Sequence, residues 1–250
     1  EQAHHFATNK NKKYTPLFNE IVSRYGLDLD GDWNMERMKH RGKHPHRYHD
    51  YILFKIKKCD MTASGDADIF IREFEQVKKK IMELAPIIVF GFNRPKALMN
   101  TINSLLTNKE AKDSDLYVFI DGARPEKEGE SNQVKAVQEY VKSIEGFKKI
   151  SYSFSSKNKG LASSIIDGIN SVIYEYGKAI VVEDDLELMP NFLSFMNQGL
   201  IFYENKKDVM SICGHSCKVK VPLDYSYDAY FFTRSSSWGW GTWSNRWSSV

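Results

Sequence analysis

The feature that most constrains the fold of this chain is a short apolar run that leads directly into three carboxylates. Residues 179–182 read Ala-Ile-Val-Val, and Glu183, Asp184 and Asp185 follow at once. Such a run is typical of a buried strand in a parallel sheet. Neighbouring carboxylates repel each other unless a cation lies between them, and their hard oxygen atoms suit Mg²⁺ or Mn²⁺. The alternative is a solvated acidic loop, which would be favoured for an isolated Asp-Asp pair.

This run belongs to a regular alternation of predicted strands and helices. Apolar strands are predicted at residues 87–90, 116–120, 150–154 and 180–182. Amphipathic helices are predicted at residues 96–107, 132–144, 161–176 and 190–203. The alternation indicates right-handed βαβ units and an α/β fold with a mostly parallel sheet. Ligands of such sheets bind beyond the carboxyl ends of the strands, so we expect the polar residues there to converge: Asn93, Arg94, Asp121, Asp184 and Asp185.

The last part of the chain is rich in tryptophan. Four of the five tryptophans lie between residues 238 and 247. Their rings either stack on sugars and bases or fill the core, and the sequence leaves both alternatives open. The cluster from Cys213 to Cys217 is predicted to be a loop rather than a zinc site, because no partner cluster exists. Neither GxGxxG nor a P-loop motif occurs, which disfavours those nucleotide sites.

Five motifs in order resemble those of the GT-A glycosyltransferases. They lie at residues 89–95 (Val-Phe-Gly-Phe-Asn-Arg-Pro), 119–122 (Phe-Ile-Asp-Gly), 158–162 (Asn-Lys-Gly-Leu-Ala), 181–187 (Val-Val-Glu-Asp-Asp-Leu-Glu) and 237–243 (Ser-Trp-Gly-Trp-Gly-Thr-Trp). The nearest pattern is the branch that includes the Golgi N-acetylglucosaminyltransferase I type and many bacterial sugar transferases. The resemblance implies a Rossmann-like GT-A domain that binds a nucleotide-sugar donor, with a UDP-sugar favoured, and a glycan or other hydroxyl acceptor.

The same resemblance implies a set of site residues. Asp185 would be the direct ligand of a Mn²⁺ or Mg²⁺ ion on the donor diphosphate. The residues that would contact the donor are Asn93, Arg94, Asp121, Asn158, Lys159, Glu183, Asp184, Trp238 and Trp240. An inverting transferase also needs a carboxylate base, and no Asp or Glu follows Asp228. We therefore expect a domain truncated at its C-terminus, which binds the donor but transfers poorly.

The first third of the chain is crowded with histidine. Six of the seven histidines lie within the first 49 residues. Neutral imidazoles suit Zn²⁺, Ni²⁺ or similar ions, and another histidine can act as a general base on water. The alternative is a solvated histidine-rich patch. The acidic run at residues 28–32 lacks the last ligand of a calcium loop, so a surface turn is predicted there.

Several short motifs of this third resemble the AHH branch of the HNH/endonuclease-VII-like nucleases, which usually form the toxic tip of bacterial polymorphic toxins. They are Ala-His-His at residues 3–5, Lys-Tyr-Thr at 13–15, Gly-Leu-Asp-Leu-Asp at 26–30, Trp-Asn at 33–34 and His-Arg-Gly-Lys-His-Pro-His-Arg-Tyr-His at 40–49. The resemblance implies a ββα-metal fold that cleaves nucleic acid with one divalent metal (Zn²⁺, Ni²⁺ or Mg²⁺).

The roles follow from the same resemblance. His4 would be a metal ligand and His5 the general base, Asn34 would orient the base, and His44 and His49 would complete the metal site. Whether His40 or His46 replaces one of them stays open. Such domains normally end their protein, whereas here another domain follows.

Together these patterns predict two domains. Residues 1–84 would form a small, His-rich, mainly helical HNH-like nuclease domain, and residues 85–250 a metal-dependent GT-A glycosyltransferase domain. The alternatives are a polymorphic-toxin nuclease with an incomplete transferase half, or one inactive module that serves for attachment. No apolar run is long enough to span a membrane, and three cysteines fit a reducing compartment. We expect a bacterial cytoplasmic protein, with export of the nuclease and an immunity protein if it belongs to a larger toxin.

Overall fold

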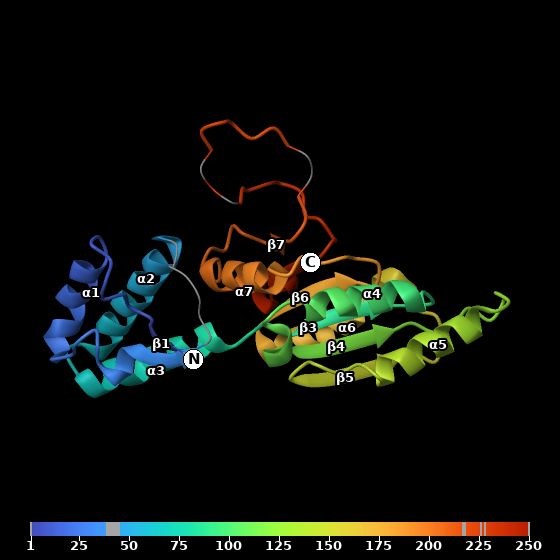
Figure 1. The fold of residues 1–250 in the computed structure, drawn as a ribbon, viewed down its shortest axis with the longest axis horizontal. Helices are drawn as coiled ribbons and strands as arrows, with labels where there is room; N and C mark the ends of the chain where they lie inside the picture. The colour runs from blue at the N-terminus through green and yellow to red at the C-terminus, as the bar shows by residue number, and fades with distance from the viewer. Residues whose placement is uncertain (1, 39–45, 217–218, 226, 228, 250) are drawn as a thin grey trace. The chain divides into compact units, whose positions relative to one another are not determined.

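The computed structural model describes residues 2–38, 46–216, 219–225, 227 and 229–249. The chain forms two compact units, Glu1–Glu83 and Leu84–Val250 (Figure 1). No helix in these residues is long and apolar enough to cross a membrane.

The first unit is a two-stranded sheet with helices. Strand β1 (Gln2–His5) pairs antiparallel with β2 (Met35–Met38), so that His5 lies opposite Met35. Its helices are α1 (Thr15–Val22), α2 (His46–Ala63) and α3 (Ala67–Met82), with short 3₁₀ turns η1 (Ser23–Tyr25) and η2 (Asp32–Asn34). The Asp66 side chain starts α3 by accepting hydrogen bonds from the N–H groups of Asp68 and Ile69. The ββα arrangement and the mainly helical character are confirmed.

Aromatic side chains make up much of the core of the first unit. Phe70 and Phe74 on α3 are fully buried. The ring of Tyr25 stacks on Phe70 at 4.4 Å between centroids, and Trp33 meets Phe74 edge-on at 5.2 Å. Each such side chain contributes about 1.5–3 kcal/mol by its burial.

The second unit is built on a six-stranded sheet in the order β5-β4-β3-β6-β8-β7. Strands β5 (Lys149–Phe154), β4 (Asp115–Ile120), β3 (Ile87–Gly91) and β6 (Lys178–Glu183) are parallel. Strand β8 (Trp240–Trp243) is antiparallel to β6, and strand β7 (Ile212–Cys213) is antiparallel to β8. The predicted α/β fold with a mostly parallel sheet is confirmed.

Helices cover both faces of this sheet. Helices α4 (Pro95–Leu106), α5 (Glu130–Lys142) and α7 (Phe192–Phe202) contribute to one core together with Ile87, Val89 and their neighbours (Figure 1). Helix α6 (Leu161–Tyr176) packs on the other face against Ile88, Phe90 and Val181. The remaining short elements are η3 (Ala111–Asp113) and α8 (Ser244–Trp247).

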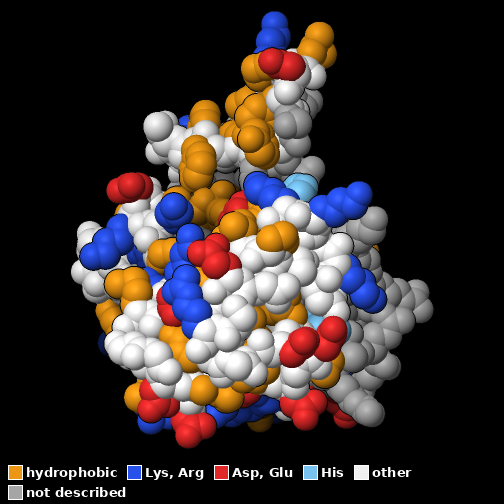
Figure 2. Space-filling view, turned by 90° about the vertical axis from the view of Figure 1, so that its left-hand side faces the viewer, with side chains coloured by type: hydrophobic (Ala, Val, Ile, Leu, Met, Phe, Trp, Pro, Cys, Tyr) orange, Lys and Arg blue, Asp and Glu red, His pale blue; other side chains and the backbone are white. Residues whose placement is uncertain are grey.

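The antiparallel edge is the main feature that the sequence did not predict. The tryptophan-rich segment forms β8 beside β6, with Trp240 opposite Val181. The loop between β7 and β8 carries exposed apolar side chains on its outer surface, including Leu223, Phe231 and Phe232 (Figure 2).

Candidate functional sites

The carboxyl ends of two neighbouring parallel strands, β3 and β6, bring Arg94 to the acidic run. In the register of the sheet, Phe90 of β3 lies beside Glu183 of β6. One guanidinium group then bridges two carboxylates: Arg94 Nη1 donates to Asp185 Oδ2 at 2.8 Å, and Arg94 Nη2 donates to Asp184 Oδ1. The expected convergence of these three residues is therefore present in the structure.

Asp184 is the buried member of the acidic run, and Asp185 is half exposed. Burial raises the pKa of Asp184, and the hydrogen bond from Arg94 opposes the rise. Burial also raises the pKa of Glu183, which accepts a hydrogen bond from Ser237. Within the described residues, Asp184 Oδ2 is buried without a hydrogen-bond partner. A buried carboxylate oxygen of this kind suits a hard cation.

A divalent ion therefore fits this donor set. Mg²⁺ and Mn²⁺ ions that carry substrate phosphates are commonly held by only one or two protein carboxylates. Asp184 and Asp185 supply such a pair, although no group of three His, Cys, Asp or Glu side chains in the described chain is arranged to hold a metal.

Asp121 joins two loops at the neighbouring strand ends. Its Oδ1 accepts from Lys159 N at 2.9 Å, and its Oδ2 accepts from Gly160 N at 2.9 Å. In return, Asn158 Nδ2 donates to Gly122 O at 2.8 Å. The sequence predicted donor contacts for Asp121, Asn158 and Lys159, and in the structure these residues hold the loops after β4 and β5 together.

Asn93 meets a residue that the sequence did not single out. Its Nδ2 donates to Glu130 Oε1 at 3.2 Å, and the same carboxylate pairs with Arg124, whose Nη2 lies 2.5 Å from Oε1. These hydrogen bonds lower the pKa of Glu130 to about 2. An acidic residue in the first turn of a helix is common, so Glu130 gave no signal of this role.

A hollow of about 490 Å³ lies beside these loops. Its walls are residues of the loops after β4 and β5: Ala123, Arg124, Pro125, Glu126, Ser156, Lys157 and Asn158. The charges of this lining are mixed, because Arg124 and Lys157 are cationic, Glu126 is anionic, and Arg124 is paired with Glu130.

Most of the clustered tryptophans fill the core, and one is exposed for stacking on a ligand, so each predicted alternative applies to part of the cluster. Trp240 packs beside Trp247 against the core, with 6.0 Å between ring centroids, and Trp243 is buried. Trp238 is 57% exposed, and its ring lies 4.5 Å from His215. The predicted donor contacts of Trp238 and Trp240 stay predictions, and Trp238 is the one available for stacking.

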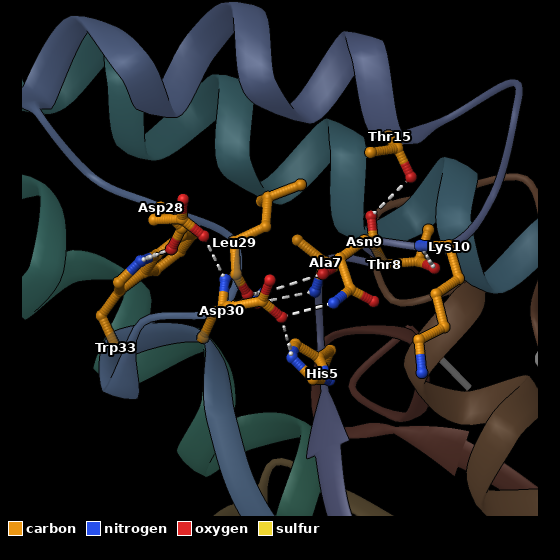
Figure 3. Close-up of polar contacts among 11 residues, drawn as sticks. His5, Ala7, Thr8, Asn9, Lys10, Thr15, Asp28, Leu29, Asp30 and Trp33 are labelled. Carbon is orange, nitrogen blue, oxygen red and sulfur yellow. Dashed lines mark hydrogen bonds and ion pairs between the residues drawn. The ribbon is translucent and has the colours of Figure 1, made fainter.

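In the first unit, His5 meets a carboxylate. Its Nε2 lies 2.9 Å from Asp30 Oδ1, and Asn9 Nδ2 donates to the same oxygen (Figure 3). Asp30 lies in the acidic run that was predicted to be only a surface turn. That run does form a turn, closed by a hydrogen bond from Gly31 N to Asp28 O at 3.0 Å.

The Asn34 side chain binds the main chain of both segments that carry this pair, the one with His5 and the one with Asp30. Its side chain accepts from Ala7 N at 2.7 Å, and donates to Ala7 O at 2.8 Å and to Leu29 O at 2.7 Å. The side chain is fully buried. Asn34 therefore acts on the backbone near His5 rather than on its ring.

The predicted metal ligands of this unit are only partly described. His4 Nε2 lies 3.2 Å from the hydroxyl of Tyr48, and the ring of His49 lies 5.7 Å from that of Tyr48. Burial lowers the pKa of His49, reinforced by the nearby His46 and opposed by Asp50. His44 and His40 lie outside the described residues, so the predicted metal site of the first unit stays a prediction.

Two family models match the chain. Residues 1–81 match AHH, described as a nuclease family of the HNH/ENDO VII superfamily with conserved AHH. Residues 55–247 match the GNT-I family. The two matches overlap at residues 55–81, which lie in α2 and α3 of the first unit. No curated protein matches the chain significantly.

Solved structures with similar parts include a crystal structure of S. aureus TarS 1–349, at 14% identity and a TM-score of 0.38, over 56% of this chain and 39% of that one. Another is the mannosyltransferase PcManGT from Pyrobaculum calidifontis in complex with GDP-Man and Mn²⁺, at 13% identity and a TM-score of 0.37, over 60% of this chain and 43% of that one. The aligned part thus spans about two fifths of each of these chains.

Proposed function

Because this chain belongs to the GNT-I family, we propose that its second unit is a metal-dependent glycosyltransferase. The donor is a nucleotide sugar, with a UDP-sugar favoured, and the acceptor is a hydroxyl of a glycan or similar molecule. The observation that carries the proposal is the meeting of Asp184, Asp185 and Arg94 at the carboxyl end of the parallel sheet.

Each residue of this site has a distinct part in the proposal. Asp185, with Asp184 beside it, holds the divalent cation, Mn²⁺ or Mg²⁺. When bound, that ion stabilises the negative charge that develops on the leaving nucleoside diphosphate. Arg94 provides a second positive group for the diphosphate. Asp121 sets the position of the Asn158–Gly160 loop, and the hollow beside Arg124 accepts the nucleoside.

The test is the substitution Asp185→Ala. Release of nucleoside diphosphate from UDP- and GDP-sugars is measured with Mn²⁺, with and without an acceptor. We expect a loss of about 10²-fold or more, because stabilising developing charge is usually the largest catalytic effect. Glu187→Ala is the matched control, since Glu187 is an exposed carboxylate two residues further on. Equal rates for Asp185→Ala and the wild type would refute the assignment.

A second function is supported by a separate observation. The AHH match over residues 1–81 and the His5–Asp30 contact favour a nuclease in the first unit. In this proposal His5 takes a proton from the water that attacks a phosphodiester of nucleic acid. The cell would then need an immunity protein if the unit is a toxin tip. The cytoplasm of a bacterium is the proposed location, and Cys59 and Cys213 are free thiols, in keeping with a reducing compartment.

A further inference from the structure

The ring of His5 is held by a carboxylate from a distant loop. Asp30 Oδ1 lies 2.9 Å from His5 Nε2, and the two residues are 25 positions apart in the sequence (Figure 3). The His5 side chain is 22% exposed and that of Asp30 is 68% exposed. The pair therefore lies at the surface, where a large substrate can reach it.

The surrounding contacts fix the loop that carries Asp30. Asp28 Oδ1 accepts from Asp30 N at 2.7 Å, and Trp33 Nε1 donates to Asp28 O at 2.7 Å. Asn9 Nδ2 donates to the same Asp30 oxygen that faces His5. The carboxylate thus has a defined direction although it is exposed.

Asn34 joins the two segments that carry the pair. Its buried amide binds both main-chain groups of Ala7, two residues after His5, and the carbonyl of Leu29, one residue before Asp30. A single buried side chain therefore connects the segment that carries His5 to the segment that carries Asp30. This arrangement explains why a motif Asn can matter without touching the base.

A neutral imidazole has one N–H and one nitrogen with a free electron pair. A carboxylate can only accept a hydrogen bond, so beside Asp30 the Nε2 atom carries the hydrogen and Nδ1 carries the electron pair.

We propose that Asp30 is the positioning residue of His5: it accepts the Nε2 hydrogen and leaves Nδ1 to act as the base. This rests on the proposed nuclease function. The water oxygen forms a bond to phosphorus while its proton moves to Nδ1 of His5. One phosphorus–oxygen ester bond breaks, and the departing sugar oxygen takes a proton from solvent. The His5 proton is then returned to water.

The test compares three variants of the full chain. Asp30→Ala removes the acceptor, and Asp30→Leu replaces the carboxylate by an apolar group of similar size that cannot accept a hydrogen bond. Asp32→Ala is the matched control, because Asp32 is an exposed carboxylate in the same acidic run. Cleavage of supercoiled plasmid DNA is measured over a range of DNA concentrations. We expect kcat to fall by about 10²-fold or more for both Asp30 variants with little change in KM, because proton transfer is lost and binding is not.

A second measurement follows the ring itself. Nitrogen-15 NMR distinguishes the two tautomers, and the His5 signal is identified by its loss in His5→Gln. We expect the Nε2–H tautomer to dominate in the wild type and in Asp32→Ala, and to lose its dominance in Asp30→Ala. An unchanged tautomer or an unchanged kcat in Asp30→Ala overturns the proposal.

The NMR result does not depend on nuclease activity. A wild type that cleaves neither DNA nor RNA would refute the proposed nuclease function. A tautomer that depends on Asp30 would in that case still establish the positioning of His5.

Discussion

At the scale of single residues, three carboxylates of the candidate sites are held by polar groups of the chain itself. Asp121 binds the backbone N–H groups of Lys159 and Gly160, Glu130 binds Arg124 and Asn93, and Asp30 faces the ring of His5. The sequence predicted that Asp121 lies at a strand end. It could not predict which donors meet it there, because those donors come from a loop 38 residues away.

Gly122 provides a sharp test of the packing between these two loops. A Cβ atom at Gly122 would lie 2.7 Å from Lys157 O and 2.8 Å from Lys157 Cα, and closer still to the carbonyl carbon. Backbone atoms cannot turn away as a side chain can. We therefore expect Gly122→Ala to lower the free energy of unfolding of the second unit by about 1–3 kcal/mol and to weaken nucleotide binding.

Thermal unfolding and calorimetric titration with UDP and Mn²⁺ measure the two effects. Ser153→Ala is the control, because Ser153 is an exposed residue of β5 and does not line the hollow. If Gly122→Ala matches that control in both measurements, the two loops are not held together as described.

At the scale of elements, the periodic segments were predictable and the loops were not. The helix predicted at 161–176 is α6, and the strand predicted at 116–120 is β4 with one more residue. Their apolar residues repeat with the period of the element, and burial selects that period directly. Strand β8 was missed because it has only four residues, Gly241 in it weakens the signal of a strand, and its pairing with β6 is a long-range contact.

The loop before α1 supplies a prediction at this scale. Lys10, Lys12 and Lys13 are exposed on it, and Thr15 Oγ1 donates to Thr8 O at 3.0 Å to hold its shape. In Figure 3 the Lys10 side chain extends downward and ends at about the height of the His5 ring. These ammonium groups suit phosphate contacts near the proposed cleavage site.

Replacing all three lysines by serine should weaken DNA binding at low salt. The slope of log affinity against log salt should become shallower by roughly 0.9 for each phosphate that the variant no longer neutralises. Fluorescence anisotropy with duplex DNA of two unrelated sequences measures both quantities. Serine at Lys109, Lys206 and Lys207, exposed residues of the second unit, is the charge-matched control. An equal effect of both triple variants would assign the binding to net charge alone.

At the scale of the whole molecule, the two proposed active sites lie in different compact units. His5 and Asp30 belong to Glu1–Glu83, whereas Arg94, Asp184 and Asp185 belong to Leu84–Val250. Each unit buries its own hydrophobic residues, so a local change in one site is not expected to unfold the other. The proposed division into functional domains at residues 1–84 and 85–250 stays a prediction.

The separation predicts that the two activities can be removed one at a time. His5→Ala should abolish nicking of plasmid DNA and leave Mn²⁺-dependent hydrolysis of a nucleotide sugar unchanged. Asp185→Ala should do the reverse. Both variants are assayed as full chains under identical conditions, and their thermal unfolding is compared with the wild type. Loss of both activities in either single variant would show that the sites depend on each other.

The loop between β7 and β8 has a consequence for how such proteins change. Gly214 N donates to Gly239 O at 2.7 Å, so the loop leaves and re-enters the sheet at one point. The entropic cost of closing a loop rises only slowly with its length. We therefore expect that residues 219–234 can be lengthened, shortened or replaced while the strands beneath keep their register. Because Ser237, which lies after this part, keeps its contact with Glu183, each exchange would present a new surface beside an unaltered acidic centre.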